Sequence, residues 1–342
     1  MDIKQLLEYS VQSEASDLHL SSGSPALVRI DGDLVKVNTQ KLNSRDVELM
    51  VNSLMNERQQ EQFKEHLEVD FSFAIEGLAR FRANVFMQMN GPAAAFRTIP
   101  DTIQTLEDLN APEILRRIAE YPRGLVLVTG PTGSGKSTTL AAMVDYINSM
   151  FPYHVLTIED PIEFVHQNNK CLINQREVFR DTLSFKNALR VALREDPDVI
   201  LVGELRDLET IRLALTAAET GHLVFATLHT TSAPKTIDRI VDVFPGDEKS
   251  MVRSMLSESL RAVISQILIK KLGGGRVAAH EIMLATSAIK NLIREDKVAQ
   301  MYSSIQTGAS MGMQTMEQSL NKLAERGEIS AEQVRSKLGQ IS

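Results

Sequence analysis

Apolar residues in the first part of the chain fall at helical spacing in some segments and at strand spacing in others. Residues 47–63 follow the helical pattern, as do four positions near the start of the chain: Ile3, Leu6, Leu7 and Val11. Residues 26–30 and 33–37 are short apolar runs on either side of Asp31 and Gly32, which predicts a β-hairpin.

Two further segments of this region, residues 69–75 and 81–85, alternate apolar and polar side chains. Such alternation is typical of half-buried strands. We therefore expect residues 1–98 to form a small α+β domain. Residues 99–112 contain prolines and show little periodicity, so we expect them to form a linker between domains.

From residue 113 onward, continuous apolar runs alternate with amphipathic segments such as residues 208–220. The runs that predict buried strands are residues 125–129, 155–159, 199–202 and 223–227. Strands of this kind linked by helices indicate a mostly parallel sheet covered on both faces. Beyond Gly246 we expect the strands to stop, so that residues 113–342 form an α/β domain with a C-terminal helical region.

The composition narrows the choice of partners and compartment. The 342 residues suggest about two domains, and the net charge of −7 argues against nucleic-acid binding as the main role. The longest apolar run, residues 262–269, is too short to span a membrane, and the first residues lack the apolar stretch of a signal peptide. A lone cysteine, Cys171, fits a reducing, cytoplasmic setting.

Residues 130–138 carry the most informative motif of the chain. They follow the predicted strand 125–129 and read Gly130, Pro131, Thr132, Gly133, Ser134, Gly135, Lys136, Ser137 and Thr138. A glycine-rich turn between a strand and a helix cradles phosphate with its backbone N–H groups. Lys136 can reach the β- and γ-phosphates and Ser137 can hold Mg²⁺, which predicts an ATP site.

Acidic residues at the ends of the other strands are candidates for the rest of the chemistry, because ligands of open α/β sheets bind beyond the strand C-termini. Glu204 ends the run 199–204, and Glu159, Asp160 and Glu163 follow the strand 155–159. Pro161 sets a turn that could project Glu163 into the site. A charged loop is the alternative interpretation of this second group.

Histidines and arginines offer further candidates. His222 and His229 stand on either side of the strand 223–228, where an imidazole could sense a γ-phosphate, although a lone histidine is more often structural. Arg82 and Arg97 lie in the N-terminal domain, and an arginine from elsewhere often neutralises transition-state charge in P-loop ATPases. A solvated strand face is the alternative for these arginines.

Four ordered motifs together resemble the secretion ATPase superfamily. They correspond to its Walker A, Asp box, atypical Walker B and His box motifs, and they are residues 130–138, 159–163, 194–207 and 220–230. Residues 288–295 resemble the signature helix of the type IV pilus retraction ATPases, with Lys290 in place of an arginine. The four-cysteine zinc motif common in assembly ATPases is missing from the sequence, and so is the C-terminal extension expected of a paralogue.

The resemblance implies a homohexamer whose subunits join a PAS-like N-terminal domain to a RecA-like ATPase domain. ATP and Mg²⁺ would bind between the domains, with Lys136 on phosphate and Ser137 and Glu204 toward Mg²⁺. Glu163 is implied as the general base and Glu204 as the support of Mg²⁺ or of the attacking water, although sequence alone does not divide the last two roles between them. The resemblance also implies that His229 senses the γ-phosphate and that His222 is a nearby switch residue. It makes three arginines candidates for an arginine finger or an interdomain contact: Arg82, Arg97 and Arg123.

The implied activity is ATP hydrolysis that powers pilus disassembly, twitching motility and, by extension, DNA uptake. The implied partners are an inner-membrane platform protein and a paralogous ATPase, which would place the ring at the cytoplasmic face of that membrane. Three alternatives stay open: an assembly or type II secretion ATPase, a RecA-like nucleic-acid translocase, and a nucleotide-binding regulator with little turnover. The aromatic content of 5% gives the translocase no support.

Overall fold

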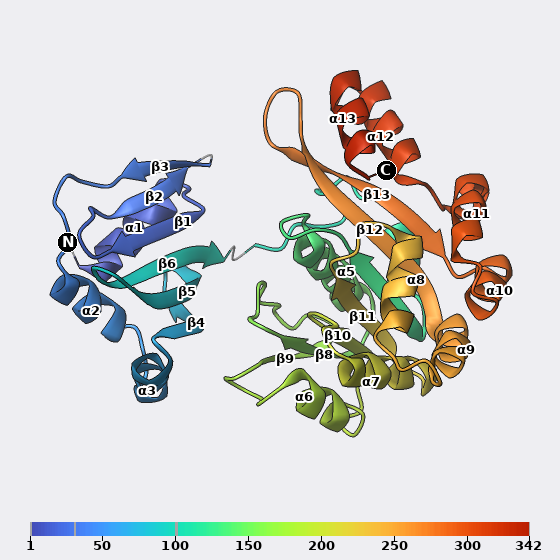
Figure 1. Cartoon of the computed structure of the whole chain (residues 1–342), viewed down its shortest axis with the longest axis horizontal. Coiled ribbons are helices and arrows are strands. Elements are labelled where there is room, and N and C mark those ends of the chain that lie inside the picture. Colours follow the sequence, from blue (N-terminus) through green and yellow to red (C-terminus); the bar gives the residue numbers. More distant parts are fainter. Residues whose placement is uncertain (1, 31, 100–101, 342) are drawn as a thin grey trace. The chain divides into compact units, whose positions relative to one another are not determined.

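The computed structural model describes residues 2–30, 32–99 and 102–341 of the chain. The chain divides into two compact units, Met1–Thr102 and Ile103–Ser342 (Figure 1). Each unit buries an apolar core of its own. Within the described ranges, no helix has both the length and the apolar character needed to cross a bilayer.

The first unit is α+β. Its described strands form a six-stranded sheet in the order β3-β2-β1-β6-β5-β4, and all neighbours are antiparallel. The strands are β1 (Asp17–Ser21), β2 (Leu27–Ile30), β3 (Asp33–Lys36), β4 (Glu68–Ile75), β5 (Ala79–Gln88) and β6 (Gly91–Ile99). The helices are α1 (Ile3–Gln12), α2 (Ser44–Asn52) and α3 (Glu57–His66).

The local expectations for this unit are met with one exception. The predicted hairpin is formed by β2 and β3, with Ile30 opposite Asp33, while Asp31 of its turn lies outside the described residues. The single helix expected over 47–63 is wrong, because two helices, α2 and α3, cover this region. Asn56 starts the second helix, since its side chain accepts a hydrogen bond from the backbone N–H of Gln59.

The second unit is built on a seven-stranded sheet in the order β13-β12-β7-β11-β10-β8-β9. All neighbours are parallel except β13, which runs antiparallel to β12 at one edge. The strands are β7 (Gly124–Thr129), β8 (His154–Glu159), β9 (Leu172–Glu177), β10 (Val199–Val202), β11 (Leu223–Leu228), β12 (Leu260–Lys270) and β13 (Arg276–Leu284). The central strands β7, β10 and β11 are buried along their whole length, as the apolar runs predict.

Helices cover this sheet and extend beyond its β13 edge (Figure 1). They are α4 (Ile114–Ala119), α5 (Lys136–Met150), α6 (Phe185–Ala192), α7 (Leu208–Glu219), α8 (Ala233–Asp242), α9 (Lys249–Ser259), α10 (Ser287–Arg294), α11 (Met301–Thr307), α12 (Met316–Glu325) and α13 (Ala331–Ile341). Two short 3-10 helices, η1 (Val298–Gln300) and η2 (Ala309–Met311), flank α11. The expected α/β fold, an N-terminal α+β domain followed by a P-loop domain with a mostly parallel sheet, is confirmed.

The expectation that strands stop beyond Gly246 is wrong. The apolar run 262–269 lies within β12, which pairs in parallel with β7, and β13 returns along it after the glycine loop at 273–275. A short apolar run cannot be assigned to a helix or a strand from periodicity alone. Here pairing with β7 favours the strand, because β12 supplies the hydrogen-bond partners that the backbone of the buried strand β7 needs on that side.

The segment expected to be a linker is divided between the two units. Ile99 ends β6, and Leu106 is buried in the core of the second unit. Residues 100 and 101 lie outside the described residues. The domain bounds of the sequence analysis therefore stay a prediction.

The segment that resembles the signature helix does form a helix, α10. Thr286 caps it by accepting from the backbone N–H of Ile289, and Ile289 and Ile293 are buried. Arg294 on the exposed side pairs with Glu258 of α9 at 3.0 Å. One face of α10 thus packs on α9, while Lys290 is only half-buried.

Candidate nucleotide-binding site

The glycine-rich loop between β7 and α5 has the geometry of a phosphate cradle. Gly130, Gly133 and Gly135 all have positive φ angles, of 142°, 76° and 85°, which glycine adopts more easily than other residues. Gly135 occupies the N-cap position of α5, and no side chain caps that helix. Its first-turn N–H groups and its positive dipole end are therefore available to an anion.

Lys136 lies inside this loop. The residue is 9% exposed, and Nζ donates to the carbonyl oxygens of Gly130 at 2.8 Å and Pro131 at 3.1 Å. Desolvation lowers the pKa of Lys136, and the negative charges of Glu204 and Glu163 act against that shift. Backbone oxygens thus hold the ammonium group inside the loop where the motif predicts a phosphate-binding site.

Glu204 and His229 meet at the carboxyl edge of the sheet. Glu204 follows β10 and His229 follows β11, and Nε2 of His229 lies 3.1 Å from Oε1 of Glu204. Arg206 donates from Nε to the other carboxylate oxygen at 2.7 Å and lies 3.6 Å from Asp160. The structure therefore brings together the carboxylate of Glu204, the imidazole of His229 and the guanidinium of Arg206. No sequence pattern marks Arg206 as a site residue, although it stands two residues after Glu204.

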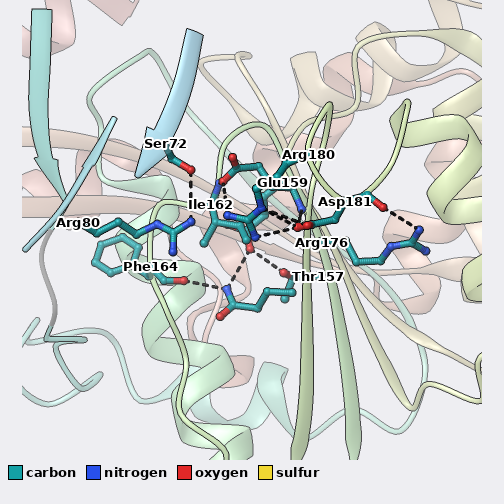
Figure 2. Close-up of polar contacts among 11 residues, drawn as sticks. Ser72, Arg80, Thr157, Glu159, Ile162, Phe164, Arg176, Arg180 and Asp181 are labelled. Carbon is teal, nitrogen blue, oxygen red and sulfur yellow. Dashed lines mark hydrogen bonds and ion pairs between the residues drawn. The ribbon is translucent and has the colours of Figure 1, made fainter. Parts of the chain in front are cut away.

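Glu159, the last residue of β8, anchors the loop that follows this strand (Figure 2). Glu159 accepts hydrogen bonds from Thr157 Oγ1 at 2.6 Å and Gln175 Nε2 at 3.3 Å, and the backbone amide of Glu163 also donates to it. Burial raises the pKa of Glu159 to about 7, against the opposing effect of these donors. This network fixes the start of the loop, while the Glu163 side chain itself is exposed.

A small cavity joins Ser137 to this network. Its lining includes Ser137, Glu159, Gly203 and Thr227, which come from α5 and the ends of the central strands. In the described ranges, no three His, Cys, Asp or Glu side chains are grouped as a complete metal site. A hydroxyl and a carboxylate suit Mg²⁺, which usually takes few protein ligands and completes its shell with water and substrate phosphate.

His222 and Arg123 lie at the opposite end of the strands from the loop. His222 precedes β11, and its Nδ1 lies 3.0 Å from the carbonyl oxygen of Ala217. Arg123 precedes β7, is exposed, and its carbonyl accepts from Arg261. Within this chain the structure does not bring either residue to the glycine-rich loop. Their nucleotide roles stay predictions without support from this arrangement.

Arg82 and Arg97 stand opposite each other on β5 and β6 of the first unit. Arg97 donates to Asp17 at 2.9 Å, and Arg82 lies 3.9 Å from Asp70. Both side chains are well exposed, that of Arg97 at 67% and that of Arg82 at 40%. Each arginine thus has an aspartate of its own unit beside it, and their role as arginine fingers stays a prediction.

A family model described as "Type II/IV secretion system protein" matches residues 1–336. The chain therefore belongs to this secretion-system family, which confirms the family resemblance that the four motifs predicted. It is 65% identical over 337 residues to the "Type IV pilus retractation ATPase PilT" of Pseudomonas aeruginosa, covering 98% of each chain.

Two further similarities point to the same branch of the family. The chain is 61% identical over 326 residues to the "Twitching motility protein" of Neisseria gonorrhoeae, covering 95% of this chain and 87% of that one. A crystal structure titled "Crystal Structure of the Pilus Retraction Motor PilT and Bound ADP" superposes with a TM-score of 0.91. That match has 50% identity and covers 98% of this chain and 96% of the other. The predicted resemblance to retraction ATPases is confirmed.

Proposed function

We propose that this chain is a subunit of the ATP-hydrolysing motor that retracts type IV pili. The meeting of Glu204 and His229 beside the Lys136 loop carries the proposal, because it combines an anion cradle with an acid and a base. The 65% identity to a retraction ATPase supports the direction of work. Disassembly of the pilus would drive twitching motility and could also serve DNA uptake.

In this proposal Lys136 and the loop amides hold the phosphates of ATP. Ser137 and Glu204 would hold Mg²⁺, directly or through water, and a metal bound there would supply positive charge to the phosphates of ATP. Glu163 and Glu204 divide the tasks of accepting the proton of the attacking water and orienting it. His229, at 3.1 Å from Glu204, would link that carboxylate to the γ-phosphate.

The motor would be a homohexamer in which nucleotide binding closes the first unit onto the second. Arg82, Arg97 and Arg123 are the candidates to neutralise transition-state charge, and closure would be driven by their differential contacts with nucleotide. The ring would act on a PilC-like platform protein at the cytoplasmic face of the inner membrane. A PilU-like paralogue is a further proposed partner.

The test replaces the native copy in cells with Lys136→Ala and measures surface pili by shearing and gel electrophoresis. Lys249→Ala is a matched control, because Lys249 pairs with Asp242 on the surface away from the loop. More pili than wild type, together with lost motility, supports retraction. Cells without pili would instead identify an assembly ATPase, and unchanged cells would refute a role in pilus dynamics.

Hydrolysis by the purified chain separates the remaining alternatives. We expect ATP turnover that single-stranded DNA does not stimulate, whereas stimulation would favour a nucleic-acid translocase. Motility that survives Glu204→Ala would favour a nucleotide-binding regulator.

A further inference from the structure

Gln266 of β12 supports the phosphate loop from beneath. Its side chain is 2% exposed, and Nε2 donates to the carbonyl oxygen of Ser134 at 2.7 Å. Its Oε1 accepts from the hydroxyl of Thr139 at 2.8 Å. One amide group therefore ties the end of the loop to the fourth residue of α5, although Gln266 lies more than a hundred residues further along the chain.

The same contact explains two glycines of the loop. A Cβ atom on Gly130 would stand 2.2 Å from the backbone oxygen of Gln266, and one on Gly135 would stand 2.9 Å from its Nε2. No side chain fits at either position unless β12 or Gln266 moves. The loop can rest on this strand only because both residues are glycine.

The hydrogen bond to Ser134 also fixes the direction of the next amide. In a trans peptide the C=O and the following N–H point in opposite directions. Holding the Ser134 oxygen toward Gln266 of β12 therefore turns the N–H of Gly135 away from that side chain. That N–H belongs to the helix N-cap, where a phosphate would bind.

We propose that Gln266 is a positioning residue for phosphate binding, acting through Ser134 and Thr139 without touching the nucleotide. This inference rests on the proposed nucleotide function of the loop. Only a group with a donor and an acceptor at this reach satisfies both contacts. An apolar side chain leaves both partners unsatisfied inside the protein, and a carboxylate loses the donor and adds a negative charge beside the phosphate site.

The first measurement compares ADP binding by the full-length wild type and Gln266→Leu, using calorimetry. We expect the variant to bind ADP about tenfold more weakly or worse, as the loss of a buried hydrogen-bond pair implies. Thr139→Val removes one of the two contacts and keeps the bond to Ser134, so it should lose less affinity. Equal ADP affinities of wild type and Gln266→Leu would overturn the inference.

The pH dependence of ADP binding by Gln266→Glu tests the positioning role directly, because a purely structural role of Gln266 would not make the relative ADP affinity depend on pH. A protonated carboxyl has the same donor and acceptor as the amide, whereas the ionised form has no donor. The ADP affinity of this variant, relative to wild type at each pH, should therefore be poor at pH 8 and recover toward pH 5.5. Gln266→Leu should show no such recovery.

The groups that titrate near Gln266 include Lys136 of the loop and His280, which pairs with Gln266 across the two strands. Burial lowers the pKa of His280 to about 4, so it stays neutral over this range. A deficit of Gln266→Glu that stays constant from pH 8 to 5.5 would also overturn the inference, and this test remains decisive if Gln266→Leu does not fold. Failure of the wild type to bind ADP would instead reject the proposed function.

Discussion

The imidazole Nε2 of His229 lies 3.1 Å from the carboxylate Oε1 of Glu204. The two residues stand at the ends of neighbouring strands, β11 and β10, and Arg206 binds the second oxygen of the same carboxylate. A carboxylate held on both sides is oriented without being buried, since 23% of its side chain remains exposed. Glu204 is therefore preorganised at the edge where phosphate would bind.

Glu204→Gln should abolish most hydrolysis while keeping nucleotide binding. The amide is nearly isosteric but cannot carry the charge that supports Mg²⁺ or water, so we expect kcat to fall about a hundredfold or more. ADP affinity should change by less than about threefold, because the loop and Lys136 are intact. Steady-state turnover and calorimetry measure the two effects, with Asp242→Asn on the surface as the control. A variant with wild-type kcat would remove Glu204 from the catalytic assignment.

Gly130→Ala and Gly133→Ala should differ sharply, although both add one methyl group to the loop. At Gly130 the new carbon meets the backbone of Gln266, whereas at Gly133 nothing lies within 4 Å. Gly133, at φ 76°, lies near the left-handed region, which costs an alanine about 1 kcal/mol, whereas Gly130, at φ 142°, lies in a region that is almost exclusive to glycine. We expect Gly130→Ala to lose about 1–3 kcal/mol more than Gly133→Ala, from the clash together with this larger strain. Chemical denaturation checks the difference, and equal losses would contradict the contact.

Glu159 should make the folded protein less stable as the pH rises. Its pKa is about 7 in the folded chain, above the ordinary 4.5, so folding favours the protonated form. The stability it contributes is complete below about 4.5 and is lost as the pH rises through 7. Glu159→Gln cannot ionise, so its melting temperature relative to wild type should increase between pH 4.5 and 7.5. A constant difference across that range would argue against the raised pKa.

His280 should have the opposite effect on the acid side. Burial lowers its pKa from 6.5 to about 4, so the folded chain favours the neutral ring. Its contribution to stability is complete above 6.5 and is lost as the pH falls through 4. His280→Gln should therefore flatten the fall in melting temperature between pH 6.5 and 4 that the wild type shows. Identical slopes for the wild type and this variant would contradict the prediction.

Some features were predictable because they depend on neighbours in sequence. The strand, glycine turn and helix around Lys136 form one continuous segment, and its local geometry follows from glycine and the helix N-terminus. Asn56, by contrast, divides an apolar pattern into two helices through a cap that the periodicity did not reveal. Periodicity records which residues are apolar, not where a backbone hydrogen bond ends a helix.

The amino-acid sequence by itself determined the phosphate loop, the acidic residues that follow the strands and the membership of a secretion ATPase family. Only the tertiary structure decided that β12 lies beside β7, which brings Gln266 under the loop. It also separated two histidines that look alike in sequence, since His229 reaches Glu204 and His222 lies at the other end of β11. The physical reason is that strand order and direction in a sheet are set by long-range pairing, and a parallel sheet gathers one end of every strand at one edge.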